Sequence, residues 1–154
     1  MKYINRTLIL VLCFLLIGSS FSYSANPPTG FRNFKWGSSP STGLKFFSGP
    51  TSDGITMYVP PSGNVQSSLF RIPVAEELYA FIEGKFFSGS AWFDSHANFE
   101  KVKAALSKEY GQPTFSNKEL NLWKWQWPGE QIEVALSYQA KFSRTTLTFV
   151  NNAI

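Results

Sequence analysis

The chain has 154 residues, with 14 basic and 10 acidic side chains and with 15 Phe, 6 Tyr and 5 Trp. It carries a single histidine and a single cysteine. Collagen-like and low-complexity chains contain more glycine and proline, disordered chains contain fewer aromatic residues, and disulfide scaffolds need more than one thiol. The composition excludes these classes and predicts one small globular domain.

Residues 1–24 have the layout of a secretory signal peptide. Lys2 and Arg6 precede an uninterrupted apolar run, Leu8 to Ile17, and small residues follow it. The ten residues of this run cover about half of a hydrocarbon core of roughly 30 Å as a helix. The pattern therefore predicts a leader that is removed on export, and an uncleaved N-terminal anchor is the alternative.

Cleavage is expected near Ser24, where small residues precede the bond, and cuts after Ser22 or Ala25 fit the same pattern. Removal of the leader takes away two basic residues and no acid, so 12 basic and 10 acidic residues leave a net charge of +2. That small charge predicts no nucleic-acid partner. Because Cys13 lies in the leader, the mature chain has no thiol for a disulfide, a nucleophile or a metal site. We expect a periplasmic or secreted protein with no transmembrane span after processing.

The next elements in chain order are a short linker and several strands. Residues 25–30 are polar and rich in proline and predict a linker, and residues 31–154 predict a single domain. Alternation predicts a strand over 31–36, although it is imperfect. A clear strand is expected over 55–59, and a less secure one over 65–74, where Pro73 interrupts the pattern.

The middle of the chain predicts a hairpin followed by a helix. Two apolar arms, 77–83 and 85–93, flank Gly84, which accommodates the positive φ of a tight reversal. Asp94 and Ser95 are N-cap candidates, and apolar residues then recur at spacings of three and four until Gly111 and Pro113. These apolar positions are Phe99, Val102, Leu106 and Tyr110. The spacing predicts an amphipathic helix that covers one face of a sheet.

Three further strands are expected over 119–127, 131–138 and 144–150, where turns and alternating residues follow one another closely. Short connections favour antiparallel pairing. The order of elements predicts an α+β fold, with an antiparallel β-sheet curled around a single amphipathic helix and ending in a three-stranded meander.

Several stretches of the chain resemble small exported bacterial domains without an assigned activity. They are Phe31, Trp36-Gly37, Pro40, the hairpin 79–93, Phe99, the helix end Tyr110-Gly111-Gln112-Pro113 and the Trp-containing strand after it. The resemblance covers nearly all of the mature chain and rests on packing and turn residues. It implies an envelope location in a bacterium and no particular activity.

The most distinctive motif is Trp123-Lys124-Trp125-Gln126-Trp127. In a strand the three indoles share one face, because side chains alternate. Trp123, Trp125 and Trp127 are therefore candidate ligand-binding residues, forming a platform on which a sugar ring, an aromatic ligand or an apolar side chain stacks. The alternative, which the sequence favours, places them in the core against the helix, since an exposed row of three indoles promotes aggregation.

Catalytic and metal-binding residues are scarce. His96 follows Asp94 and Ser95 at the start of the helix, and sequence neighbours do not form a nucleophile, base and orienting group. No Asp or Glu cluster has the spacing of a metal site, so we expect no metal and no cofactor. Hydrolysis of glycosides needs a pair of carboxylates. The candidates are Glu76, Glu77, Glu83, Glu130 and Glu133, and all five are interpreted as ordinary exposed acids.

The sequence thus favours an exported, non-catalytic domain that binds an envelope protein, a glycan or a small molecule. An envelope hydrolase that uses carboxylates and a structural accessory subunit are the alternatives. The sequence does not identify the ligand.

Overall fold

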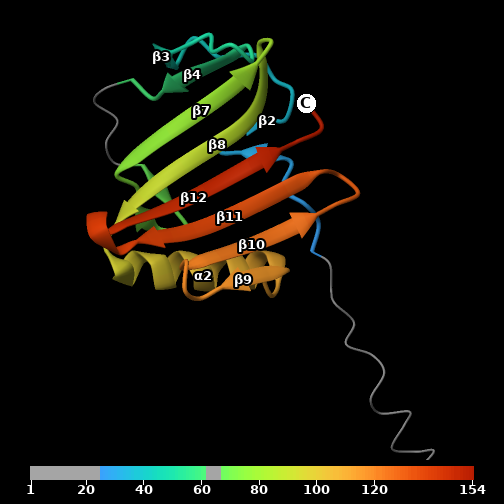
Figure 1. Cartoon of the computed structure of the whole chain (residues 1–154). Coiled ribbons are helices and arrows are strands. Elements are labelled where there is room, and N and C mark those ends of the chain that lie inside the picture. The colour runs from blue at the N-terminus through green and yellow to red at the C-terminus, as the bar shows by residue number, and fades with distance from the viewer. Residues whose placement is uncertain (1–24, 62–66) are drawn as a thin grey trace, which may run out of the picture.

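An eight-stranded sheet with a helix packed on one face forms the body of the protein in the computed structural model, which describes residues 25–61 and 67–154 (Figure 1). The predicted leader and the beginning of the predicted strand 65–74 lie outside the described residues. The strand order is β3-β4-β7-β8-β12-β11-β10-β9, and neighbouring strands are antiparallel throughout. In chain order the strands are β3 (Lys45–Ser48), β4 (Ile55–Val59), β7 (Glu76–Ile82), β8 (Lys85–Asp94), β9 (Phe115–Asn117), β10 (Leu122–Trp127), β11 (Ile132–Gln139) and β12 (Arg144–Asn151).

Two small hairpins lie outside this sheet. They are β1 (Gly30–Phe31) with β2 (Phe34–Lys35), and β5 (Ser68–Leu69) with β6 (Ile72–Pro73). The single strand expected over 31–36 is therefore wrong. Arg32 has φ 57°, in the left-handed region, and the chain reverses there instead of continuing as an extended run.

The predicted helix is confirmed as α2 (His96–Tyr110), the one α-helix in the described part of the chain. It buries Phe99, Val102 and Leu106 as its periodicity indicates. Ser95, at φ 69°, precedes it without a capping side-chain hydrogen bond, and Gly111 follows it at φ 79°. A short 3-10 turn, η1 (Ala140–Phe142), joins β11 to β12.

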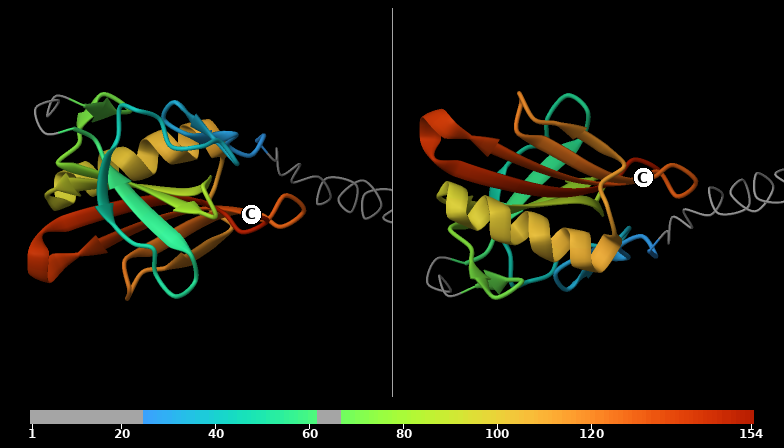
Figure 2. Two further views of the ribbon diagram at one scale, coloured as in Figure 1. Left: turned by 90° about the horizontal axis from the view of Figure 1, so that it is seen from above. Right: turned by 90° about the horizontal axis from the view of Figure 1, so that it is seen from below.

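The core lies between the sheet and α2 (Figure 2). Alternate residues of β7, β8, β10, β11 and β12 are buried on this side, as expected for strands with one face on a core. The first small hairpin is packed on the same side, where the Phe31 ring lies 5.4 Å from that of Phe149. Gly89 permits this packing, because a Cβ atom there would lie 2.2 Å from the Phe31 ring.

The fold is α+β and mainly β, as the sequence predicts at that level. The expected curl of the sheet around the helix is not confirmed, since α2 lies on one face of an open sheet (Figure 1). A three-stranded meander as the end of the fold is not confirmed either, although β10, β11 and β12 pair in chain order. β12 also pairs with β8, and β10 also pairs with the short edge strand β9, so these strands belong to the single large sheet.

Candidate functional site

The three tryptophans of β10 share the sheet face that packs on α2. Trp125 and Trp127 are 1% and 7% exposed and belong to the core, whereas Trp123 is half-buried. The Trp123 ring packs edge-on to Phe99 at 5.1 Å, and Lys103 Nζ lies 4.8 Å from its centroid. Of the three indoles, only Trp123 has part of its ring at the solvent.

The two buried indoles have hydrogen-bond acceptors. Trp125 Nε1 donates to the carbonyl oxygen of Gly111 at 2.9 Å, just beyond the end of α2. Trp127 Nε1 donates to the carbonyl oxygen of Ala25 at 2.7 Å, at the beginning of the described chain. These bonds satisfy donors that would otherwise be costly to bury, so the indoles tie two remote segments to β10.

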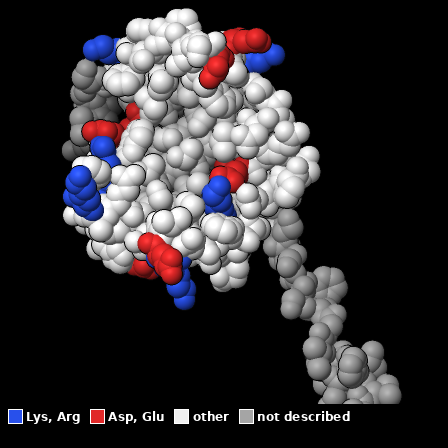
Figure 3. Space-filling model, viewed as in Figure 1, with Lys and Arg blue, Asp and Glu red and all other residues white. Residues whose placement is uncertain are grey.

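A second candidate is the sheet face that points away from α2, which we call the open face. Residues one position away from the core residues of each strand lie on it, because side chains alternate. Figure 3 shows this face hollowed over its middle and mostly free of charged side chains. A broad, weakly charged surface of this kind is suited to contact with another molecule.

Aliphatic side chains occupy the β4–β7 part of the open face. The registers Ile55↔Ile82 and Met57↔Ala80 put these four residues on one face, with Leu78 two positions before Ala80 on β7. All five are half-buried. We call them the aliphatic band.

Hydroxyl side chains follow on the neighbouring strands β8 and β12. Ser90 is opposite Thr148, and their hydroxyl oxygens lie 3.0 Å apart. Ser88 and Thr146 lie on the same face of these strands. A molecule on the open face would therefore contact aliphatic groups at one side and uncharged hydrogen-bonding groups beside them.

Two ion pairs lie on the open face. Lys124 Nζ lies 2.9 Å from Glu133 Oε1, and Gln126 Nε2 donates to Glu133 Oε2 at 2.8 Å. Arg144 Nη2 lies 2.6 Å from Glu76 Oε2. Three exposed charged residues lie at the strand ends that border this face: Lys45, Lys85 and Asp94. The two ion pairs add no net charge to the middle of the surface that would attract or repel a partner.

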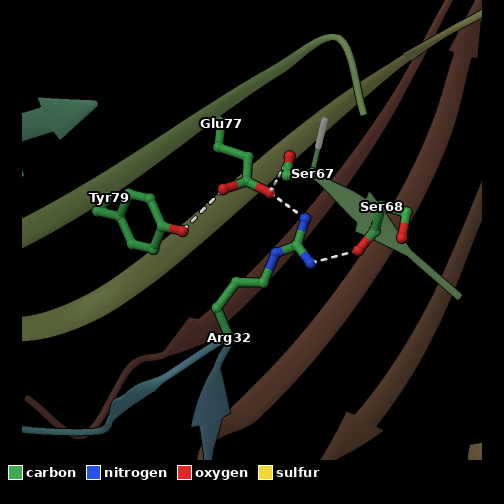
Figure 4. Close-up of polar contacts among 5 residues, drawn as sticks. All are labelled: Arg32, Ser67, Ser68, Glu77 and Tyr79. Atoms are coloured by element: carbon green, nitrogen blue, oxygen red, sulfur yellow. Dashed lines mark hydrogen bonds and ion pairs between the residues drawn. The ribbon is translucent and has the colours of Figure 1, made fainter. Parts of the chain in front are cut away.

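A polar cluster lies on the other side of the sheet, between β7 and the two small hairpins (Figure 4). Glu77, only 7% exposed, forms an ion pair with Arg32 and accepts hydrogen bonds from Tyr79 Oη at 2.8 Å and Ser67 Oγ at 3.3 Å. Arg32 also donates from Nη1 to the carbonyl oxygen of Ser68. The cluster joins three separate segments, and its carboxylate oxygens are occupied by donors of the chain itself.

Burial is the main cause of a raised pKa at Tyr79, and the Glu77 carboxylate adds to it while Arg32 acts in the opposite direction. Burial, followed by the Glu109 carboxylate, also raises the pKa of Tyr110 above its ordinary value of 10.0. Both phenols therefore keep their protons at neutral pH, and Tyr79 acts as a hydrogen-bond donor to Glu77.

We expect the free energy of unfolding to fall as the pH rises above about 10. The unfolded chain loses the tyrosine protons there while the folded chain retains them, so alkaline pH favours unfolding. The fall is predicted to be shallower in Tyr79→Phe and in Tyr110→Phe than in the wild type. Urea unfolding between about pH 8 and pH 11 measures it, and an unchanged alkaline slope in both variants would contradict the assignment.

Glu76 and Glu77 are not arranged as a hydrolytic pair. Glu76 and Glu77 are adjacent in β7 and point to opposite faces of the sheet. Each of Glu76, Glu77 and Glu133 has a cation as partner, whereas glycoside hydrolysis needs two carboxyl groups facing one substrate. Within residues 25–61 and 67–154, no group of three or more His, Asp or Glu side chains could hold a metal ion.

His96 lies at the exposed start of α2. Its ring stacks on Phe99 at 5.5 Å and meets Tyr138 edge-on at 4.8 Å. These are packing contacts with aromatic rings.

Two features of the structure differ from the sequence-based prediction. Glu77, predicted as an exposed acid, is buried. Its position is the signal for this, because Glu77 lies two and four positions before Tyr79 and Phe81, on the core-facing side of the same strand. The open face is the second feature, and its composition is defined only when the registers of several strands are known.

The geometry thus defines a mainly antiparallel α+β domain with an uncovered, weakly charged sheet face. Comparison with protein-family models, with curated proteins and with solved structures found no match. In the described residues no helix is long and apolar enough to cross a membrane.

Proposed function

We propose that the chain is an exported, non-catalytic domain that binds an apolar surface of an envelope protein through its open face. The observation that carries the proposal is the composition of that face, an aliphatic band beside uncharged hydroxyl groups, with two ion pairs next to them. Depletion of charge is typical of the centre of protein interfaces. The leader over residues 1–24 supports export.

The choice of a protein as partner follows from the side chains present. A charged ligand would lose its hydration against the aliphatic side chains of this surface. Glycans bind best to flat aromatic rings, and the aliphatic band of Ile55, Met57, Leu78, Ala80 and Ile82 contains none. Trp92 lies on the same face opposite Thr146, and the Arg144 guanidinium lies over its ring, 5.6 Å from the centroid. Aliphatic side chains of a protein partner gain from burial against these residues at about 25 cal/mol per Å².

The proposal is tested by photocrosslinking in living cells. A photoreactive residue is placed at Met57 or Thr148 on the open face and, as a control, at Lys101 on the exposed side of α2. We expect one discrete protein adduct from the open-face positions and none from Lys101. Equal crosslinking from both sides would contradict the proposal.

A matched pair of substitutions provides the second arm. Ala80→Glu introduces a charge into the aliphatic band, and Ala104→Glu introduces the same charge at an exposed position of α2. We expect Ala80→Glu to reduce the adduct at least about tenfold, which corresponds to 1.4 kcal/mol of binding free energy, and Ala104→Glu to leave it unchanged. Both variants should remain folded by circular dichroism. An adduct that survives Ala80→Glu would exclude the open face as the binding surface.

Export is tested separately by cell fractionation. The full chain should be found in the envelope fraction without its leader. A variant with charges in the apolar run, Leu10→Arg with Leu15→Arg, should remain in the cytosol at its precursor mass, because a leader needs an uninterrupted apolar run. If the unsubstituted chain were also found in the cytosol with its leader attached, the export half of the proposal would be overturned.

A further inference from the structure

The segment at the beginning of the described chain is held against the domain by two indoles. Trp127 Nε1 donates to the carbonyl oxygen of Ala25, and Trp36 Nε1 donates to the carbonyl oxygen of Pro28, each at 2.7 Å. Trp127 is 7% exposed, and Pro28 is buried. Burying an indole N–H group without an acceptor costs free energy. The carbonyl groups of Ala25 and Pro28 therefore belong to the folded domain.

The same segment lines a hollow of about 460 Å³. Its lining also includes Glu109 and Tyr110, the last two residues of α2 before the chain turns at Gly111. The Tyr110 ring meets Trp127 edge-on at 5.4 Å and 82°. Ala25 and the exposed carboxylate residue Glu109 thus belong to one hollow.

These contacts bear on the three cleavage positions that the sequence allows. A cut after Ala25 would remove the acceptor of the Trp127 indole, whereas cuts after Ser22 and after Ser24 both keep it. Only a cut after Ser24 makes the Ala25 nitrogen a cationic terminus, and the hollow that Ala25 lines is also lined by Glu109, whose carboxylate attracts a cation.

We propose that the mature chain begins at Ala25 and that its N-terminus docks in this hollow, with the Ala25 carbonyl group bound by Trp127. The inference rests on the export half of the proposed function. The contact of Ala25 with Trp127 is present in the uncleaved chain, so cleavage would add a charged terminus at a site that is already formed. Residues 25–30 would serve as an anchored arm in the mature protein.

The first measurement is the mass of the processed protein recovered from the envelope fraction. It should correspond to a chain that starts at Ala25. A product starting at Tyr23 or Asn26 would overturn the proposed terminus.

The second measurement is hydrogen exchange of the indole N–H groups by NMR. Cytosolic fusions cleaved in vitro give the chain with Ala25 first and the chain with Asn26 first, so the test does not depend on export. We expect exchange at Trp127 to be at least about tenfold faster without Ala25. Exchange should be unchanged at Trp36, whose acceptor Pro28 remains, and at Trp125, which donates to Gly111.

Equal exchange at Trp127 in the two chains would overturn docking, whatever the location of the protein in the cell. A different outcome is a chain that stays unprocessed in the cytosol while Ala25 slows exchange at Trp127 in vitro. That result would contradict both the export half of the proposed function and the proposed terminus. The contact between this segment and the hollow would still hold.

Discussion

Trp125→Ala is expected to lower the free energy of unfolding by about 3–5 kcal/mol. The side chain is 1% exposed and is among the largest fully buried side chains of the core. Its removal leaves a cavity between β10 and the end of α2, and the Gly111 carbonyl loses its indole donor. The free energy of unfolding of a small domain is about 5–15 kcal/mol, so the variant should be marginally stable or unfolded at room temperature.

Two control variants accompany this substitution. Trp125→Phe keeps one six-membered ring but loses the N–H group and the second ring of the indole, so it should cost less than Trp125→Ala, about 1–3 kcal/mol. Leu120→Ala truncates a large apolar side chain that is 66% exposed, and should change stability by at most about 0.5 kcal/mol. Urea unfolding followed by circular dichroism measures all three. A Trp125→Ala domain as stable as Leu120→Ala would show that Trp125 does not belong to the core.

The elements that the sequence predicted well are those whose local pattern and tertiary role agree. The stripe of Phe99, Val102 and Leu106 marks α2 because the same residues that satisfy helical spacing are buried against the sheet. The hairpin of β7 and β8 has long apolar arms and a glycine in its turn, so local and long-range preferences coincide there as well.

The elements that the sequence missed depend on partners far along the chain. Arg32 adopts a positive φ and also pairs with Glu77, which is 45 positions away, so the tight hairpin β1–β2 has no local sequence signal. The edge strand β9 has only three residues and exists by pairing with β10. Local patterns do not contain such information.

The candidate site shows the same division. Alternation alone places Trp123, Trp125 and Trp127 on one face, and the structure adds that this face is the one packed on α2. The open face, by contrast, combines residues of β4, β7, β8 and β12 whose registers no local pattern specifies. Its aliphatic band is therefore a property of the fold.

Glu77→Ala is expected to cost about 3–5 kcal/mol of stability, because it removes a buried carboxylate and leaves the half-buried Arg32 side chain without its counter-charge. The Arg32 side chain is 19% exposed, and that of Glu77 is 5% exposed. The hydroxyl groups of Tyr79 and Ser67 lose their acceptor in the same variant. The neighbouring residue supplies a matched control: Glu76 pairs with Arg144 at the surface, with side-chain exposures of 63% and 36%, so Glu76→Ala should cost at most about 1 kcal/mol.

A double-mutant cycle separates the pair from the rest of the cluster. Arg32→Met with Glu77→Leu removes both charges and keeps apolar volume, so it should be less destabilising than the sum of the two single changes. The difference, the coupling free energy, is expected to be about 1–3 kcal/mol by urea unfolding. A coupling near zero would mean that Arg32 holds the two small hairpins through Ser68 and backbone contacts alone. A large coupling would mean that one ion pair joins β7 to the two small hairpins that precede it, and that these segments loosen together when either charge is lost.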